Sequence, residues 1–211
     1  MKRFLILLSS VLCLLASVQA ADPVPLDQGL TYLRISSLPH SAQDLREALL
    51  KPAPLVIDLR YTADEPGAAD ALRALNSQLR KPVLYILVSP ATPKSLGDIL
   101  ATTATPLTIL GVKGSHPEPT VVVAQSAADD RHAYDALATG TPLADLISGK
   151  VEKERFDEAS LVTEFKNGNH DARPPEAPAD DKTPAPAHVV DRVLQRAAQL
   201  QRALLALKPR G

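Results

Sequence analysis

Four short segments dominated by apolar residues recur along the chain, and segments with helical periodicity lie between or after them. They cover residues 55–59, 83–88, 107–112 and 120–124. An apolar run of this length is typical of a strand that is buried on both faces, and such strands occur in parallel sheets covered by helices. The alternation therefore predicts an α/β fold in which a mostly parallel sheet alternates with helices through right-handed crossovers.

The intervening segments have the spacing of amphipathic helices. Residues 41–50, which Ser41 is expected to cap, and residues 67–79 carry leucine and alanine on one face. We also expect a strand at 30–35 and helices at 94–101, 130–137, 142–147 and 156–165. A chain of 211 residues is long enough for one domain with a proper core, and with 3% aromatic residues that core must be aliphatic.

The first 20 residues have the three parts of a secretory signal peptide. Lys2 and Arg3 form the positive region, residues 4–18 are almost entirely apolar, and Val18-Gln19-Ala20 places small residues where a signal peptidase cleaves. The apolar stretch is too short for a stable membrane span. We expect cleavage near Ala20 and a periplasmic or secreted bacterial protein; an uncleaved anchor is the alternative.

The one cysteine, Cys13, lies inside this signal. The mature chain therefore has no disulfide, no zinc-thiolate site and no cysteine nucleophile. A formal net charge of −1 leaves no cationic excess to neutralise phosphates, which argues against a nucleic-acid partner.

The chain changes character after its predicted α/β domain, which spans residues 21–166. Residues 167–187 are rich in proline and predict an extended linker. Residues 188–211 follow with an amphipathic helix up to Leu207, whose apolar face includes Val193, Leu194, Leu204 and Leu207. We expect this helix to dock on the domain, because a lone helix of this length is marginally stable in water. A helix that binds a partner is the alternative.

Motifs for cofactors and metals are missing from the sequence. Glycine-rich phosphate loops are absent, and no two histidines lie three or four residues apart as a helix-borne metal site requires. The Gly-x-Ser-x-Gly turn of many hydrolases is also absent. We therefore expect neither cofactor-binding residues nor metal ligands.

Three segments, taken in order, carry a resemblance to a known family. Residues 32–38 resemble a family strand, "GYIRISSF", residues 55–60 resemble "LILDLR", and residues 84–101 resemble the strand and helix that hold the nucleophile. Together they resemble the carboxy-terminal processing (tail-specific) peptidases, which are serine–lysine enzymes with a ClpP/crotonase-like fold. The resemblance spans about residues 30–123.

The resemblance implies roles for two residues. Ser95 matches the nucleophile, at the start of a helix whose amides and dipole help to hold an oxyanion. Lys113, in the turn after the next strand, is the candidate for the lysine base. Several features depart from the family. Its spacing places the lysine at Pro117, and Pro93-Lys94 precede Ser95 in place of small residues. The glycines that supply oxyanion donors after the "DLR" strand are replaced by residues 61–65, with no glycine before Gly67.

These departures favour an exported, catalytically degenerate member that binds a peptide or protein segment. An active serine–lysine endopeptidase that uses Ser95 and Lys113 is one alternative. An unrelated exported structural α/β protein is the other. No stable membrane span is expected once the signal peptide is cleaved.

Overall fold

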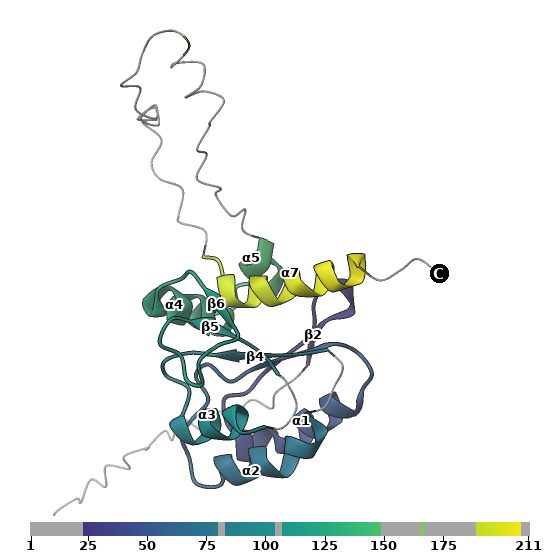
Figure 1. The fold of residues 1–211 in the computed structure, drawn as a ribbon, viewed down its shortest axis with the longest axis vertical. Helices are drawn as coiled ribbons and strands as arrows, with labels where there is room; N and C mark the ends of the chain where they lie inside the picture. The colour runs from purple at the N-terminus through teal and green to yellow at the C-terminus, as the bar shows by residue number, and fades with distance from the viewer. Residues whose placement is uncertain (1–22, 80–82, 104–106, 149–165, 167–188, 208–211) are drawn as a thin grey trace, which may run out of the picture.

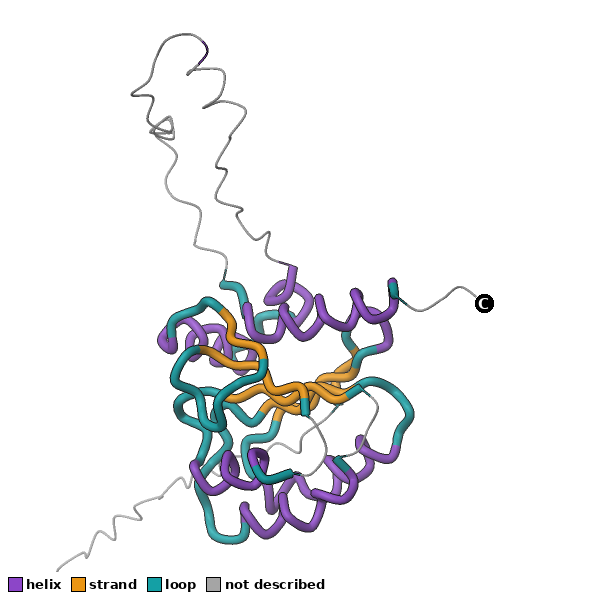
Figure 2. Tube along the Cα trace, in the orientation of Figure 1, coloured by secondary structure: helices purple, strands orange, loops and turns teal. Residues whose placement is uncertain are grey.

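The computed structural model describes residues 23–79, 83–103, 107–148, 166 and 189–207. The predicted signal peptide (1–20), the predicted helix at 156–165 and the predicted linker (167–187) lie outside these residues. In the described part, helices cover both faces of a central sheet, which gives three layers (Figures 1 and 2).

Six strands form the sheet of the described part, in the order in which they occur along the chain. β1 pairs antiparallel with β2, and β2 to β6 are all parallel. The prediction of an α/β fold with a mostly parallel sheet is confirmed. The strands are β1 (Val24–Pro25), β2 (Thr31–Arg34), β3 (Leu55–Asp58), β4 (Leu84–Val88), β5 (Thr108–Val112) and β6 (Val121–Val123).

The three crossover helices, α1 (Leu38–Leu50), α2 (Ala68–Leu75) and α3 (Lys94–Ala101), lie together below the sheet in Figure 1. Each strand is added beside the previous one in the same direction, so right-handed crossovers bring every helix to the same face. Alternate residues of the strands, such as Leu33 and Ile57, pack against these helices.

The opposite face of the sheet is covered by elements from the C-terminal half of the chain. These are α4 (Ala127–Ala138), α5 (Leu143–Ser148) and α7 (Arg192–Ala206), which lie above the sheet in Figure 1. Val193, Leu194 and Ala197 of α7 are fully buried in a core with residues of β2 to β5. The expected docking of the C-terminal helix on the domain is therefore confirmed.

The helix boundaries differ from the sequence expectations where side chains make specific hydrogen bonds. Ser37, not Ser41, caps α1, because its hydroxyl accepts a hydrogen bond from the amide of His40 (3.4 Å) and the helix starts at Leu38. The helix predicted at 67–79 ends as α2 at Leu75 and continues as a short 3₁₀ turn. Strand β1 is too short to give a sequence pattern.

The faces of α7 also differ from the expectation. Leu204 and Leu207 are 45% and 79% exposed, whereas Gln195 and Gln201 are buried. The Gln195 amide donates to the carbonyl of Ile147 (3.0 Å), which satisfies a polar group inside the core. Two leucines that were expected to be buried are therefore exposed, and two glutamines are buried in the contact with the domain.

Candidate functional site

The loops that follow parallel strands leave the sheet at its carboxyl edge, where α/β proteins usually bind ligands. β3 leads into Arg60, β4 leads into the start of α3, and β5 leads into the turn that contains Lys113. The residues that the sequence marks as candidates therefore lie at the same edge of the sheet, on different loops.

Ser95 lies in the first turn of α3, and its side chain is exposed. The carbonyl of Pro93 accepts the amide hydrogen bonds of Leu96 and Gly97, so the helix begins in regular geometry. Lys113 is also exposed, beside Gly114, whose φ of 85° closes the turn. Within the described residues, the side chains of Ser95 and Lys113 make no hydrogen bond to each other. Their assignment as nucleophile and base stays a prediction.

His116 is the side chain that reaches α3 from the loop after β5. Its Nε2 lies 2.9 Å from Oδ1 of Asp98. Its ring packs so closely on Gly97 that a Cβ there would lie 2.1 Å from the imidazole Cδ2. Lys94 completes the group, because its Nζ donates to both carboxylate oxygens of Asp98 at 2.9 Å. Hydrogen bonds from Lys94 and then from His116 lower the pKa of Asp98.

Local sequence patterns do not predict this contact of His116 with Asp98. Asp98 and His116 are 18 residues apart on different elements, so no helical or strand spacing links them. The sequence feature that points to this loop is Pro117, the neighbour of His116, which occupies the position that the spacing in the peptidase family assigns to the lysine.

The arrangement of Ser95, Asp98 and His116 does not form a catalytic triad. In a triad the imidazole lies between the nucleophile and the carboxylate and contacts each through a different nitrogen. Here Ser95 and Asp98 are three residues apart on one helix, so their side chains project from the same side of α3. Nε2 of His116 faces Asp98, and no hydrogen bond joins His116 to Ser95.

The backbone amides after Arg60 are at the position where the resemblance implies an oxyanion hole. The amide of Thr62 donates to the carbonyl of Leu59 (3.4 Å), and the amide of Ala63 donates to the carbonyl of Ser36 (2.8 Å). The Thr62 hydroxyl also donates to the carbonyl of Ile35 (2.7 Å). Two of the amides in the segment that replaces the family's glycines are therefore already used within the fold.

Arg60 itself is the centre of a buried charge cluster. It is fully buried, and its guanidinium donates to Asp58 from Nε (3.0 Å) and Nη2 (2.7 Å). Nη1 donates to Asp130 (2.8 Å) and to Asp191 (3.0 Å), and Nη2 also donates to Asp191 (2.7 Å). These contacts use all five guanidinium N–H groups. Asp191 in addition caps α7 by accepting the amide of Leu194 (2.9 Å), so Arg60 joins β3, α4 and α7.

Three carboxylates around one guanidinium leave an excess of negative charge, which hydroxyl groups partly offset. Tyr32 donates to Asp58 (2.7 Å), and Tyr61 donates to Asp130 (2.8 Å). Burial raises the pKa of both tyrosines, so both hydroxyls keep their protons. Burial also raises the pKa of Asp130, against the opposing effect of Arg60.

A second layer of cations surrounds the cluster. The Arg34 guanidinium lies 3.6 Å from the ring centroid of Tyr134, and the Arg131 guanidinium lies 4.6 Å from that of Tyr61. The two rings are 4.6 Å apart between centroids. Cation–π contacts of this kind favour positive charge near the cluster. The charged and hydroxyl groups of the cluster contact one another, as they do in a structural network.

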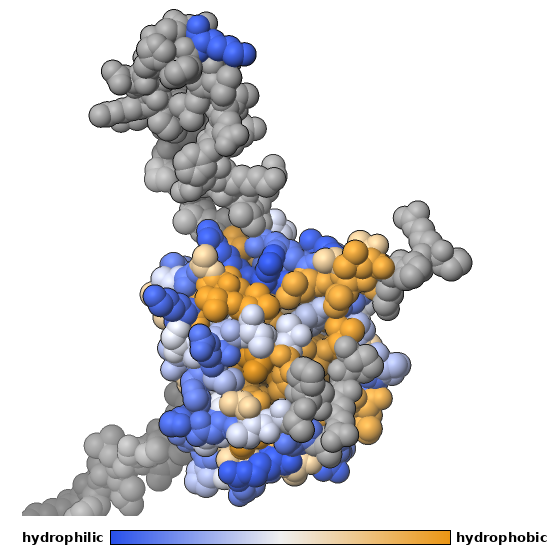
Figure 3. All heavy atoms as spheres, viewed as in Figure 1, coloured by the Kyte–Doolittle hydropathy of each residue, from blue (hydrophilic) through white to orange (hydrophobic). Residues whose placement is uncertain are grey.

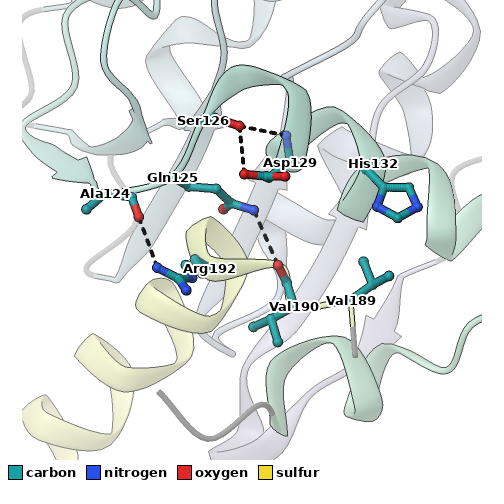
Figure 4. Close-up of a pocket in the computed structure, with 8 residues that line it drawn as sticks. All are labelled: Ala124, Gln125, Ser126, Asp129, His132, Val189, Val190 and Arg192. Atoms are coloured by element: carbon teal, nitrogen blue, oxygen red, sulfur yellow. Dashed lines mark hydrogen bonds between the residues drawn. The ribbon is translucent and has the colours of Figure 1, made fainter. Parts of the chain in front are cut away.

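An open cleft of about 480 Å³ lies beyond the carboxyl end of β6, between the first turns of α4 and α7 (Figure 4). Gln125 donates to the carbonyl of Val190 (3.3 Å), and Arg192 donates to the carbonyl of Ala124 (3.3 Å). Oε1 of Gln125 is buried and has no hydrogen-bond partner in the part of the chain that the structure describes. The residues that line the cleft are Ala124, Gln125, Ser126, Asp129, His132, Val189, Val190 and Arg192. The sequence did not mark these residues, because they come together from two segments that are far apart in the chain.

Metal ligands do not gather in the described part of the chain, where no group of three or more histidine, cysteine or acidic side chains is placed to hold an ion. Among the described helices, none is both long enough and apolar enough to cross a membrane.

Comparisons with known proteins add no relative. The chain matches no protein-family model, no curated protein and no solved structure.

Proposed function

We propose that this chain is an exported, catalytically inactive relative of the tail-specific serine–lysine peptidases, with a ClpP/crotonase-like fold, and that it binds an extended segment of a peptide or protein. The observation that carries the proposal is the environment of Ser95. Its side chain is exposed and, among the described residues, has no hydrogen-bonded base, since Lys94 and His116 both contact Asp98 instead. A serine hydroxyl is a weak nucleophile unless an adjacent base accepts its proton.

The path of the chain supports the fold part of the proposal. Parallel strands β2 to β5 follow one another in order, and the helices between them pack on one face. A chain that always advances in the same direction is what a superhelical fold requires.

The edge of the sheet supports the binding part. In the described part, β6 pairs only with β5, and Val122 is 57% exposed on it. An unpaired strand edge accepts an extended peptide as an additional strand, with main-chain hydrogen bonds that supply affinity. The cleft of Figure 4 begins directly after β6 and offers room for a side chain or chain end of the same peptide.

Two experiments test the two halves of this proposal separately. A serine-reactive fluorophosphonate should label the mature protein and its Ser95→Ala variant equally weakly. Labelling of the wild type that the variant loses would instead favour the active endopeptidase that uses Ser95 with Lys113 as base.

Peptide binding is tested with a library of extended peptides, followed by fluorescence anisotropy of the hits. Val122→Lys places a charge on the β6 edge and should abolish binding, because an edge lysine opposes strand pairing. Val24→Lys, on β1 at the other edge of the sheet, is the matched control and should leave affinity unchanged. A library without any hit, or equal loss in both variants, would favour an exported structural protein.

A further inference from the structure

The outer face of α7 is basic. Arg192 and Arg196 are exposed and lie on one stripe of the helix with Leu207, since residues 4 and 11 apart in a helix project in similar directions. Arg202 is exposed on the flank of the helix, about 100° around the axis from this stripe. From residue 192 to the end, the sequence holds five of the 23 basic residues of the chain and none of its 24 acidic residues.

Two of these arginines have no carboxylate partner within the described residues. Arg192 donates to the carbonyl of Ala124 (3.3 Å), and Arg196 donates to the side chain of Gln199 (3.3 Å). Arg202 pairs with Asp27 at 3.2 Å, where both side chains are about half exposed. Such an exposed pair is weak and exchanges readily with another anion. The exposed Asp145 on the neighbouring α5 makes no ion pair with α7.

The C-terminal end of the same helix exposes apolar side chains. Leu204 is 45% exposed and Leu207 is 79% exposed. Figure 3 shows apolar residues gathered at this end of α7. The helix therefore presents Arg192, Arg196 and Leu207 outward, with Arg202 and Leu204 on its two flanks, while its opposite side remains packed on the sheet.

We propose that the outer face of α7 docks the protein on an anionic lipid surface. Guanidinium groups pair with phosphate oxygens in bidentate geometry, and the two leucines would enter the interfacial layer. A second copy of the chain fits this face poorly, because it would bring arginines against arginines. A soluble anion would leave the leucines in water. The inference does not depend on peptide binding.

Co-sedimentation with vesicles tests the inference on the mature full chain. Vesicles of phosphatidylglycerol and phosphatidylcholine in equal parts should bind it, and pure phosphatidylcholine vesicles should not. Each basic residue near such a surface contributes a factor of about five, so Arg196→Gln with Arg202→Gln should weaken binding about 30-fold. Leu204→Ser with Leu207→Ser should weaken it about ten-fold. Salt at about 1 M should abolish binding, because the screening length then falls to about 3 Å.

A matched control comes from the helices on the other side of the sheet. Arg46→Gln with Arg73→Gln changes the net charge equally on α1 and α2, and should leave vesicle binding intact. Circular dichroism confirms that each variant is folded. Equal binding to neutral vesicles, no binding to anionic ones, or equal weakening in the control would overturn the proposal. So would a dimer in sedimentation equilibrium that Leu204→Ser with Leu207→Ser dissociates, because a second copy would then occupy this face.

Discussion

Replacing Arg60 with methionine tests how the buried cluster holds the molecule together. The substitution keeps an unbranched chain of similar length and removes all five guanidinium hydrogen bonds. It leaves Asp58, Asp130 and Asp191 buried without the cation that contacts all three directly. Removal of one partner from a buried ion pair costs about 3–5 kcal/mol, because the remaining charge stays desolvated. Since three carboxylates are left here, we expect a loss of at least about 3 kcal/mol of unfolding free energy at pH 7.

Urea unfolding followed by circular dichroism measures this loss, and its pH dependence tests the cause. Without Arg60, carboxyls in the folded Arg60→Met variant would titrate above their unfolded pKa values. Stability should then recover as the pH falls from 7 through those raised pKa values, and level off below about 4. Neutralising all three partners as asparagine in the Arg60→Met background should restore much of the loss at pH 7. A loss below about 1 kcal/mol in Arg60→Met would refute the reasoning, since it would mean that the carboxylates remain solvated.

Three other substitutions test single contacts. Asp130→Asn should flatten the pH dependence of stability. Because the pKa of Asp130 is raised in the folded protein, its ionisation opposes folding, and the wild type gains stability from this group as the pH falls through that pKa toward 3.8. Urea midpoints of both proteins at several pH values measure the difference. Gly97→Ala forces a Cβ to within 2.1 Å of His116 and should cost about 1–3 kcal/mol, most of which His116→Ala in the same chain should restore in thermal unfolding. Failure of that rescue would place the clash elsewhere. Gly111→Ala brings a Cβ to 2.6 Å from the carbonyl oxygen of Val88, which is a backbone atom. Ser115→Ala should therefore not restore the stability lost in Gly111→Ala in thermal unfolding, and a full rescue would contradict the geometry.

The sheet and its crossover helices could be predicted because their signals are local. Strands β3 and β4 are buried on both faces, so continuous apolar runs mark them directly. Helix α3 has the predicted bounds, since its apolar residues recur at helical spacing up to Ala101. The cap of α1 was misplaced by four residues, because Ser37 and Ser41 are both suitable capping residues and only the path of the chain chooses between them.

The candidate sites depend on contacts that local patterns do not encode. Asp130 and Asp191 lie 70 and 131 residues beyond Arg60, so no local spacing links them to it, whereas Asp58 lies two residues away. The cleft after β6 likewise joins residues from both sides of the predicted linker. Both features follow from the docking of α7, and sequence periodicity predicts that a helix docks without predicting where its first turn lies.

The docking of α7 also bears on our proposal that Ser95 is not a catalytic nucleophile. In the family that the sequence resembles, the segment after the "DLR" strand supplies amides to the reaction. Here the same segment is directed into the fold: Arg60 and Tyr61 contact Asp130, and Arg60 also contacts Asp191. The amide of Ala63 donates to the carbonyl of Ser36. Residues committed to a buried network of this kind are not free to stabilise an oxyanion, since moving them would leave carboxylates buried and unpaired. The segment after β3 is therefore held by the cluster that secures the C-terminal helix, which is why we infer a binding role and not turnover.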